Sequence, residues 1–371
     1  MEAIVLDPGS HTLKAGYAAY NTPADMEPSV VVPPCVYDTE AHGEAGQRDA
    51  SLYHRCLHRG VVTNMEQYEA LLQFVLYDQI GWPQGDEGNL LYAEPLFTSK
   101  AEREDLCQLM FEVFNVSGLF FCDQAVLSLY ACGKPTGCVV DIGHGKIDIT
   151  TVTDGQTNVP SARRLEYGGA TQSELLRSLL QRRGCGNLSD REIEGLKERI
   201  CAVASCSEEH TRLQAGATGE GGAGELFALP DGQEICVRKE GLMAGELLFA
   251  PPSELVGADV PGLAGAVYNA IVNHHEVSMR RIVYEHLMIC GGGSCIAGVQ
   301  DRLLAESRLL APPSISPAAV ATPDYMPKHT HRYAAWMGGA ILAKVVFPQS
   351  HHMTRAEYDE RGPTAMHNKC G

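Results

Sequence analysis

The sequence predicts an α/β fold divided into two domains. Apolar runs typical of buried strands alternate along the chain with amphipathic stretches typical of helices. Two of the strands run into the same kind of turn, IVLDPGS at residues 4–10 and VVDIGHG at residues 139–145. A chain of 371 residues is also too long for one compact core, so two domains of roughly 150 residues or more are expected.

Both turns combine the groups that a phosphate and its metal ion require. In each, an Asp stands two residues before a Gly, so that backbone N–H groups can hold phosphate oxygens while the carboxylate faces the metal. Each turn continues into an alternating strand that completes a hairpin, with one face made by Leu13, Ala15 and Tyr17 and by Ile147, Ile149 and Thr151. A single turn of this kind is usually an ordinary hairpin. Two such turns, far apart in the sequence, predict two halves of the protein that bind one nucleotide.

Helix starts are marked by Ser or Thr followed three residues later by Glu, the pattern of a capping box. The candidates are Thr63/Glu66, Thr171/Glu174, Ser189/Glu192 and Thr354/Glu357. Between the helical segments, residues 90–96 predict a strand, and the turn sequence LPDG at 229–232 predicts a hairpin. Residues 33–58 and 206–225 have no sustained period and predict loops.

The formal net charge of −17 limits the partners that the chain can have. An acidic surface repels phosphate backbones and anionic lipid headgroups, and it favours basic protein segments. We therefore expect no direct contact with nucleic acid and none with a membrane. The longest apolar stretch, residues 336–347, is interrupted by Lys344, which also argues against a membrane span. These features predict a soluble intracellular protein.

The thirteen cysteines favour reduced, packed thiols. Their number is odd, none has Cys-x-x-Cys spacing, and most lie in apolar runs, as do Cys107, Cys138, Cys201 and Cys290. The histidines that occur close together lack the Cys or acidic neighbours of a zinc site, so they are predicted to be surface residues. They are His274, His275, His329, His331, His351 and His352.

Seven segments, in order along essentially the whole chain, resemble the actin family. They are residues 4–18, 109–133, 139–149, 229–233, 290–303, 333–343 and 358–370. The resemblance implies an actin-like fold, with two ribonuclease-H-like domains around a nucleotide cleft, as in hexokinases and Hsp70-type ATPases. It implies that residues 1–131 plus 334–371 form domain I, with an outer subdomain at about 29–57. Residues 132–333 would form domain II, with an outer subdomain at about 168–257.

The resemblance implies that ATP or ADP binds with Mg²⁺. Asp7 and Asp141 would face the metal ion through water. Ser10 and the N–H groups around Gly9 would hold the terminal phosphates, with Lys14 as a positive charge. The second loop would mirror this through Gly143 and Gly145, and further nucleotide contacts are implied at Gly169, Lys197, Glu198, Gly291, Gly292 and Arg332.

Hydrolysis is expected to be vestigial at most. The glutamine that helps to position the attacking water in actins is present as Gln124, but Asp148 replaces the corresponding histidine. His144 replaces an acidic residue of the second loop. An Asp beside the γ-phosphate would add repulsion where negative charge already concentrates, and Pro8 has no N–H to offer in the first loop. We therefore expect a protein that is not an enzyme.

Polymerisation is also expected to be lost. The outer loop that inserts into a neighbouring subunit in actin is shorter and unrelated here, between Pro33 and Arg59. Gly371 stands in place of the terminal aromatic residue of actins, and Glu254 interrupts the apolar character of the plug segment at residues 251–262. These differences predict a protein that stays monomeric in filament-forming salt.

Within the family, residues 114–118, 141–149, 324–328 and 338–349 resemble a divergent nuclear group of plant actin-related proteins. That implies a nuclear protein, with a cytoplasmic pool left open, that is an architectural subunit of a SWI/SNF-type chromatin-remodelling complex. It would bind the basic helicase-SANT-associated helix of the remodeller ATPase, together with actin or another actin-related protein and other remodelling subunits. The implied groove residues are Tyr130, Ala131, Ala335, Met337 and Leu342.

Two alternatives stay open at this point. One is an ATP-hydrolysing enzyme or chaperone-like relative of the sugar kinase type, which the change at Asp148 opposes. The other is a cytoskeletal filament-forming actin relative, which the altered outer loop opposes. Similarity to actins well beyond the phosphate loops also favours an assembly subunit over a kinase.

Overall fold

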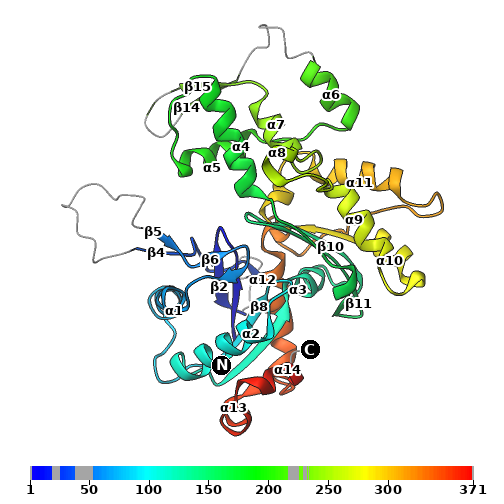
Figure 1. The fold of residues 1–371 in the computed structure, drawn as a ribbon. Helices are drawn as coiled ribbons and strands as arrows, with labels where there is room; N and C mark the ends of the chain where they lie inside the picture. The colour runs from blue at the N-terminus through cyan, green and yellow to red at the C-terminus, as the bar shows by residue number, and fades with distance from the viewer. Residues whose placement is uncertain are drawn as a thin grey trace. The chain divides into compact units, whose positions relative to one another are not determined.

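The structure is a computed structural model that describes residues 2–18, 26–37, 53–215, 225–228, 232 and 234–369 (Figure 1). The chain divides into two compact units. The first unit comprises Met1–Pro135, Asp154–Thr157 and Ala321–Gly371, and the second comprises Thr136–Thr153 and Asn158–Val320. Both chain ends therefore belong to the first unit. Apart from the short segment Asp154–Thr157, the boundaries between the units lie at 135/136 and 320/321. The boundaries predicted from the sequence were 131/132 and 333/334.

A six-stranded sheet forms the centre of the first unit, in the order β17-β9-β8-β1-β2-β3. Strand β1 (Ile4–Pro8) is buried along its whole length, as the apolar run predicts. It pairs antiparallel with β2 (Leu13–Tyr17) and parallel with β8 (Asn89–Glu94), which lies parallel to β9 (Gly118–Asp123). The edge strands are β3 (Val30–Val32) and β17 (Met353–Thr354).

The second unit repeats the same strand pattern. Strand β10 (Gly137–Ile142) pairs antiparallel with β11 (Ile147–Thr153) and parallel with β16 (Leu287–Cys290). Strand β13 (Arg163–Leu165) then pairs antiparallel with β11, as β3 does with β2 in the first unit. The predicted α/β fold and both predicted hairpins are confirmed, and each unit has one Asp-x-Gly hairpin beside a parallel strand.

Helices α1 (Met65–Gln73), α2 (Lys100–Gln108) and α13 (Arg355–Arg361) of the first unit start at a residue whose side chain caps them, whereas α3 (Gln124–Ala131) and α12 (Thr330–Val346) have no side-chain cap. Helix α1 is capped by Asn64, whose side chain accepts from the Gln67 N–H, so the predicted cap at Thr63 is wrong by one residue. The remaining elements of this unit are π-helical η3 (Phe74–Gln79) and η4 (Leu109–Val113), η9 (Pro363–Ala365), α14 (Met366–Lys369), and strands β4 (Cys35–Tyr37), β5 (Tyr53–Arg55), β6 (Leu57–His58), β7 (Val61–Val62) and β12 (Gln156–Thr157).

Two of the four predicted capping boxes are present. Ser189 caps α5 (Asp190–Ile200) with Glu192, and Thr354 caps α13 with Glu357. The box predicted at Thr171 is wrong, because α4 (Gly169–Arg182) begins earlier, at Gly169. The other helices of the second unit are η5 (Val159–Ser161), α6 (Ser207–Ala215), α7 (Glu240–Glu246), α8 (Ser253–Val256), α9 (Leu263–Val272), η7 (Val277–Met279), α10 (Arg280–Glu285), η8 (Gly292–Cys295) and α11 (Val299–Leu310).

The segments predicted as loops contain some regular structure. Helix α6 occupies part of 206–225, and strands β4, β5 and β6 occupy part of 33–58, so both predictions were wrong there. Residues 38–52 and 216–224 lie outside the described residues. The predicted hairpin at LPDG is confirmed by the antiparallel pairing of β14 (Glu225–Ala228) with β15 (Glu234–Val237).

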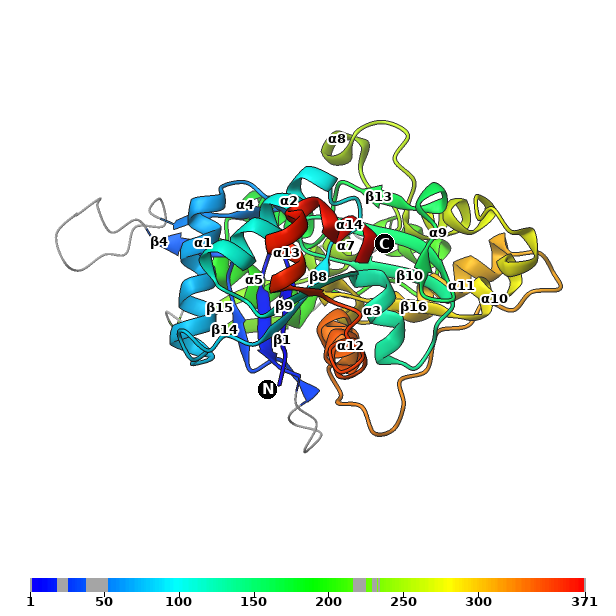
Figure 2. The same cartoon turned by 90° about the horizontal axis from the view of Figure 1, so that it is seen from below.

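Helices α3 and α12 pack along each other in the first unit, and they lie side by side in both views (Figures 1 and 2). A Cβ placed on Gly338 of α12 would lie 1.7 Å from the backbone oxygen of Leu127 in α3. The Trp336 indole of α12 is fully buried and donates to the backbone oxygen of Val5 at 3.1 Å. Glycine therefore lets the two helices approach closely over strand β1.

Some polar residues are more buried than the sequence suggested. His274 and His352, predicted to be surface residues, are 1% and 8% exposed. His274 is held by a hydrogen bond of 3.0 Å between its Nε2 and Thr153 Oγ1. The described cysteines are free thiols, and the four named from the sequence are buried, as predicted. No described helix is long and apolar enough to cross a membrane.

Candidate functional site

The first loop holds a buried carboxylate at the end of β1. Asp7 is 3% exposed and lies directly opposite Lys14 in the β1–β2 hairpin. The Lys14 Nζ lies 3.0 Å from Asp7 Oδ2, and Gln124 Nε2 donates to Asp7 Oδ1 at 2.7 Å. Gln124 is the first residue of α3, so this helix is attached at its start to the carboxylate.

Two predicted phosphate contacts of the first loop already have partners within the unit. The Gly9 N–H donates to the backbone oxygen of Thr12 at 3.1 Å, and a Cβ on Gly9 would lie 2.6 Å from that oxygen. Ser10 Oγ accepts from the Gly60 N–H at 3.1 Å. Ser10 keeps a hydroxyl hydrogen for a ligand, whereas the Gly9 N–H serves to close the turn.

The second loop closes in the same way, and helix α4 begins against it. The Gly143 N–H donates to the backbone oxygen of Lys146 at 3.0 Å, around the turn that contains Gly145. The Gly169 N–H donates to the backbone oxygen of Gly143 at 3.0 Å, and the Ala170 N–H to that of His144 at 2.7 Å. The predicted site residues Gly143, Gly145 and Gly169 are therefore brought together in the second unit.

Asp141 occupies the position in β10 that Asp7 has in β1. It lies opposite Asp148 in β11 and beside Cys290 in β16. Gly291 follows β16 with a φ of +84°, and a Cβ there would lie 2.3 Å from Asp141 Oδ1. The backbone of Gly291 can thus approach the Asp141 carboxylate because it has no side chain. At its neighbour Gly292, a Cβ would meet nothing within 4 Å.

Asp148 is the centre of a buried ionic cluster. Arg164 donates to both of its carboxylate oxygens, at 2.7 Å from Nε and 2.9 Å from Nη2, and Lys146 Nζ lies 2.5 Å from Oδ2. Asp148 is 7% exposed and Lys146 is 8% exposed. The sequence led us to expect that Asp148 adds repulsion beside a γ-phosphate. In the structure two cations share this carboxylate, which offsets its negative charge.

Burial and charge act in opposite directions on Lys146. Burial lowers the pKa of the Lys146 ammonium, and the nearby Asp148 carboxylate raises it again, with a net lowering. The neighbours of Asp148 in the strand, Ile147 and Ile149, are fully buried in the apolar core of the second unit. Because side chains alternate along a strand, the ionic cluster lies on the face of the sheet opposite to that core.

Lys197 is occupied by contacts within the second unit. Its Nζ donates to the backbone oxygen of Gly169 at 3.0 Å and to Ser173 Oγ at 2.7 Å, and it lies 2.5 Å from Glu194 Oε2. An ammonium has three N–H donors, so these partners use all of them. Lys197 thus connects α4 with α5, and Glu198, the other residue predicted to contact the nucleoside, is exposed.

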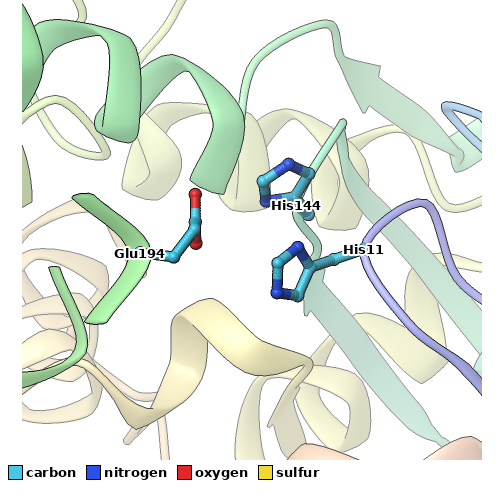
Figure 3. Close-up of side chains that lie close together, drawn as sticks. All are labelled: His11, His144 and Glu194. Atoms are coloured by element: carbon cyan, nitrogen blue, oxygen red, sulfur yellow. The ribbon is translucent and has the colours of Figure 1, made fainter. Parts of the chain in front are cut away.

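Glu194 and His144 lie close together on the same side of this unit. A nitrogen of His144 and a carboxylate oxygen of Glu194 are within 4.8 Å, and Figure 3 shows both side chains. Burial raises the pKa of the Glu194 carboxyl. The Lys197 ammonium and the Ser173 hydroxyl lower this pKa by more than burial raises it, so the net shift is downward. Glu194 is therefore a charged residue at neutral pH. Figure 3 also draws His11, which belongs to the first unit.

The predicted groove residues differ in their exposure. Tyr130, Ala335 and Leu342 are half-buried on the surface of α3 and α12. Ala131 and Met337 are 0% and 1% exposed, so they have no free surface to offer a partner. Arg332, the remaining predicted nucleotide contact, is half-buried in α12 of the first unit. It is far from both loops in the sequence.

Comparison with known proteins identifies the family. A model of the actin family matches residues 1–189 and 186–371, which together span the chain. The chain belongs to the actin family. It is 42% identical over 374 residues to actin-related protein 7 of rice, from both the indica and the japonica subspecies, with full coverage of both chains. It is 39% identical over 376 residues to actin-related protein 7 of Arabidopsis thaliana, again with full coverage.

Membership of the actin family confirms the fold predicted from the seven segments. Three charged residues of the site were missed by the sequence reasoning: Lys146, Arg164 and Glu194. A signal for one of them was present, because Lys146 stands two residues before Asp148, directly before strand β11, and side chains two apart fall on the same face. The position of Arg164 opposite Asp148 depends on the pairing of β13 with β11, which no local pattern revealed.

Proposed function

We propose that this chain is a non-filamentous nuclear actin-related protein, with a cytoplasmic pool left open, and an architectural subunit of a SWI/SNF-type chromatin-remodelling complex. The observation that most supports a non-enzymatic role is the state of Asp148. The Asp148 carboxylate accepts from Arg164 on both oxygens and contacts Lys146, so its oxygens are already engaged and are not free to orient an attacking water. Similarity to actin-related proteins 7 over the full chain supports the rest of the proposal.

Within this proposal the two loops bind an adenine nucleotide, ATP or ADP, with Mg²⁺. The donor set fits such a ligand, because each hairpin places one carboxylate, Asp7 or Asp141, at the end of a strand and carries one lysine: Lys14 pairs with Asp7, and Lys146 pairs with Asp148 opposite Asp141. Mg²⁺ commonly keeps several waters, so the carboxylates would face a hydrated ion. When bound, the ion would supply positive charge to the phosphate oxygens.

The proposed partner is the basic helicase-SANT-associated helix of the remodeller ATPase, shared with actin or another actin-related protein and flanked by other remodelling subunits. A chain of net charge −17 complements a Lys/Arg-rich helix, and the two would attract each other over a long range. The half-buried residues Tyr130, Ala335 and Leu342 on α3 and α12 supply apolar surface. Val345 of α12, which is 46% exposed, extends it.

A pull-down tests this role directly. The tagged full chain is mixed with the N-terminal region of the remodeller ATPase, and binding of the chain is expected. The variant Leu342→Asp should weaken binding at least tenfold, because it places a charge on apolar contact surface. Val113→Asp is the matched control, since Val113 is also a partly exposed aliphatic residue of the first unit, at 44% exposure, but lies on η4. Failure of the wild-type chain to bind the helix would overturn the proposal.

Two further measurements separate the rival functions. Sedimentation in Mg²⁺ and KCl should leave the chain in the supernatant, whereas a pellet of polymer would favour a filament-forming protein. Phosphate release from ATP should stay at background, whereas turnover with a small-molecule acceptor would favour an enzyme. Melting curves of each variant show that the fold is intact in these assays.

A further inference from the structure

The geometry of the second hairpin points to Lys146 as a direct ligand of the terminal phosphate. We propose that the Lys146 ammonium binds a phosphate oxygen of the nucleotide and that this fixed charge lets the second loop bind phosphate without a divalent cation. The inference rests on the nucleotide binding proposed above. The inference goes beyond that proposal because it assigns a phosphate-binding role to Lys146, a residue that neither the loop motif nor the comparisons single out.

The two hairpins can be compared position by position. Asp7 lies opposite Lys14 in the first, and Asp141 lies opposite Asp148 in the second, seven residues later in each case. The position that holds a lysine in the first hairpin thus holds a carboxylate in the second. Lys146, two residues before Asp148, returns a positive charge to the same face.

The Lys146 ammonium has donor capacity that the described residues do not use. Its Nζ is buried, and among the described residues its one ion-pair partner is Asp148 Oδ2 at 2.5 Å, which occupies one of its three N–H groups. Arg164 already donates to both oxygens of that carboxylate. A buried ammonium with unused N–H groups is unfavourable unless a ligand accepts from it. A phosphate oxygen is such an acceptor.

Secondary structure favours an anion at this position. The two positive charges of Lys146 and Arg164 balance the negative charges of Asp148 and of Asp141 opposite it, so a phosphate here would be bound through unused donor groups and not through excess charge. Helix α4, of fourteen residues, begins at Gly169 and is hydrogen-bonded through its first N–H groups to the loop oxygens of Gly143 and His144. The N-terminal end of a helix adds positive potential, which favours a phosphate there.

Nucleotide titrations of the full-length protein test the inference. The affinities for adenosine, ADP and ATP are measured by calorimetry for wild type and Lys146→Met, in Mg²⁺ and again in EDTA. Lys146→Met should weaken ADP and ATP binding about 10- to 100-fold in EDTA and leave the affinity for adenosine unchanged, since only phosphate would contact the ammonium. Lys146→Arg should restore part of the loss, because it keeps the charge.

A charge-matched control accompanies these variants. Lys239→Met makes the same change at an exposed residue of the second unit and should leave every affinity unchanged. Melting temperatures identify any variant that fails to fold, in which case Lys146→Arg and Lys146→Gln are compared instead, with the larger loss expected for the uncharged glutamine.

The outcomes separate the two proposals. If wild type binds ADP and Lys146→Met binds it equally well in EDTA, the role of Lys146 is overturned while nucleotide binding stands. A loss of wild-type ADP binding in EDTA to below a hundredth of that in Mg²⁺ also overturns the role of Lys146. If wild type binds no nucleotide even in Mg²⁺, the nucleotide-binding proposal fails and the role of Lys146 fails with it.

Discussion

Asp141 and Asp148 lie directly opposite each other in the β10–β11 hairpin. Two like charges in this relationship destabilise a sheet unless other groups balance them. Lys146 and Arg164 supply the balance, one from the turn and one from the neighbouring strand β13. The ionic cluster is therefore part of what holds the second unit together as well as part of its proposed phosphate site.

Replacing Asp148 with Ala should lower the free energy of unfolding by about 3–5 kcal/mol. The change leaves the buried Lys146 and the half-buried Arg164 without their shared anion, which is the costly way to break an ion pair that is mostly shielded from water. Urea denaturation at neutral pH measures the loss. Asp190→Ala is the control, because the Asp190 side chain that pairs with Arg177 is 85% exposed and its loss should cost under about 1 kcal/mol. Equal losses for the two variants would contradict the structural role of the cluster.

Gly291→Ala should be strongly unfavourable, whereas Gly292→Ala should be close to neutral. Gly291 has a φ of +84°, and its new Cβ would lie 2.3 Å from Asp141 Oδ1, whereas a Cβ on Gly292 meets nothing within 4 Å. We expect a loss of about 2 kcal/mol or more at Gly291, from backbone strain and displacement of the carboxylate. Thermal unfolding of both variants checks this, and a larger loss at Gly292 would refute it.

Gly338→Ala should disrupt the packing of α3 on α12. The added methyl group would lie 1.7 Å from the backbone oxygen of Leu127, so the helices must separate, at a cost of about 3 kcal/mol or more. Gly195→Ala offers the opposite case, because Gly195 lies inside α5 with nothing within 4 Å of a Cβ. Alanine there should stabilise by about 0.5–1 kcal/mol. Denaturation midpoints that move in the same direction would show that the close approach is not as described.

The stabilising effect of Glu357 should depend on pH in a narrow acid window. A hydrogen bond from Lys369, together with the capping hydrogen bonds of Thr354, lowers the pKa of Glu357 from 4.5 to about 2. A carboxyl whose pKa is lower in the folded state stabilises fully above pH 4.5 and loses this effect as the pH falls to about 2.

The comparison variant for this effect is Glu357→Gln, which keeps a capping side chain but cannot ionise. The difference in melting temperature between wild type and Glu357→Gln should therefore shrink between pH 4.5 and 2. The carboxylate is partly exposed, so added salt should reduce the difference as well. A difference that stays constant across this pH range would contradict the assignment.

The strands and hairpins of the fold were largely predictable because their signals are local. The apolar runs before Asp7 and Asp141 identified β1 and β10, and alternation identified β2 and β11. The caps at Ser189 and Thr354 were found in the same way. The cap at Thr63 failed because Asn64, one position later, is the more favourable capping residue, although the capping-box spacing to Glu66 pointed to Thr63.

What the sequence did not reveal depends on contacts between distant residues. The family resemblance implies Lys197 as a nucleotide contact, yet its three donors are used by Gly169, Ser173 and Glu194 on two helices. The burial of His274 depends on Thr153, which is far away in the chain. The charge state around Asp148 was misjudged for the same reason, because Arg164 reaches it only through the pairing of β13 with β11.

Helix α3 begins at Gln124, hydrogen-bonded to the Asp7 carboxylate, and ends at Ala131, one residue after Tyr130 of the proposed partner surface. Gly338 lets α12 lie directly against the backbone of α3 at Leu127. Any sliding of α3 along α12 would therefore break this contact between the two backbones. The two helices are therefore packed as one unit that contacts the first phosphate loop at the start of α3 and carries the proposed partner surface. If a ligand at the loop changes the affinity for the partner helix, thermodynamic linkage requires the partner helix to change the affinity for the ligand by the same factor.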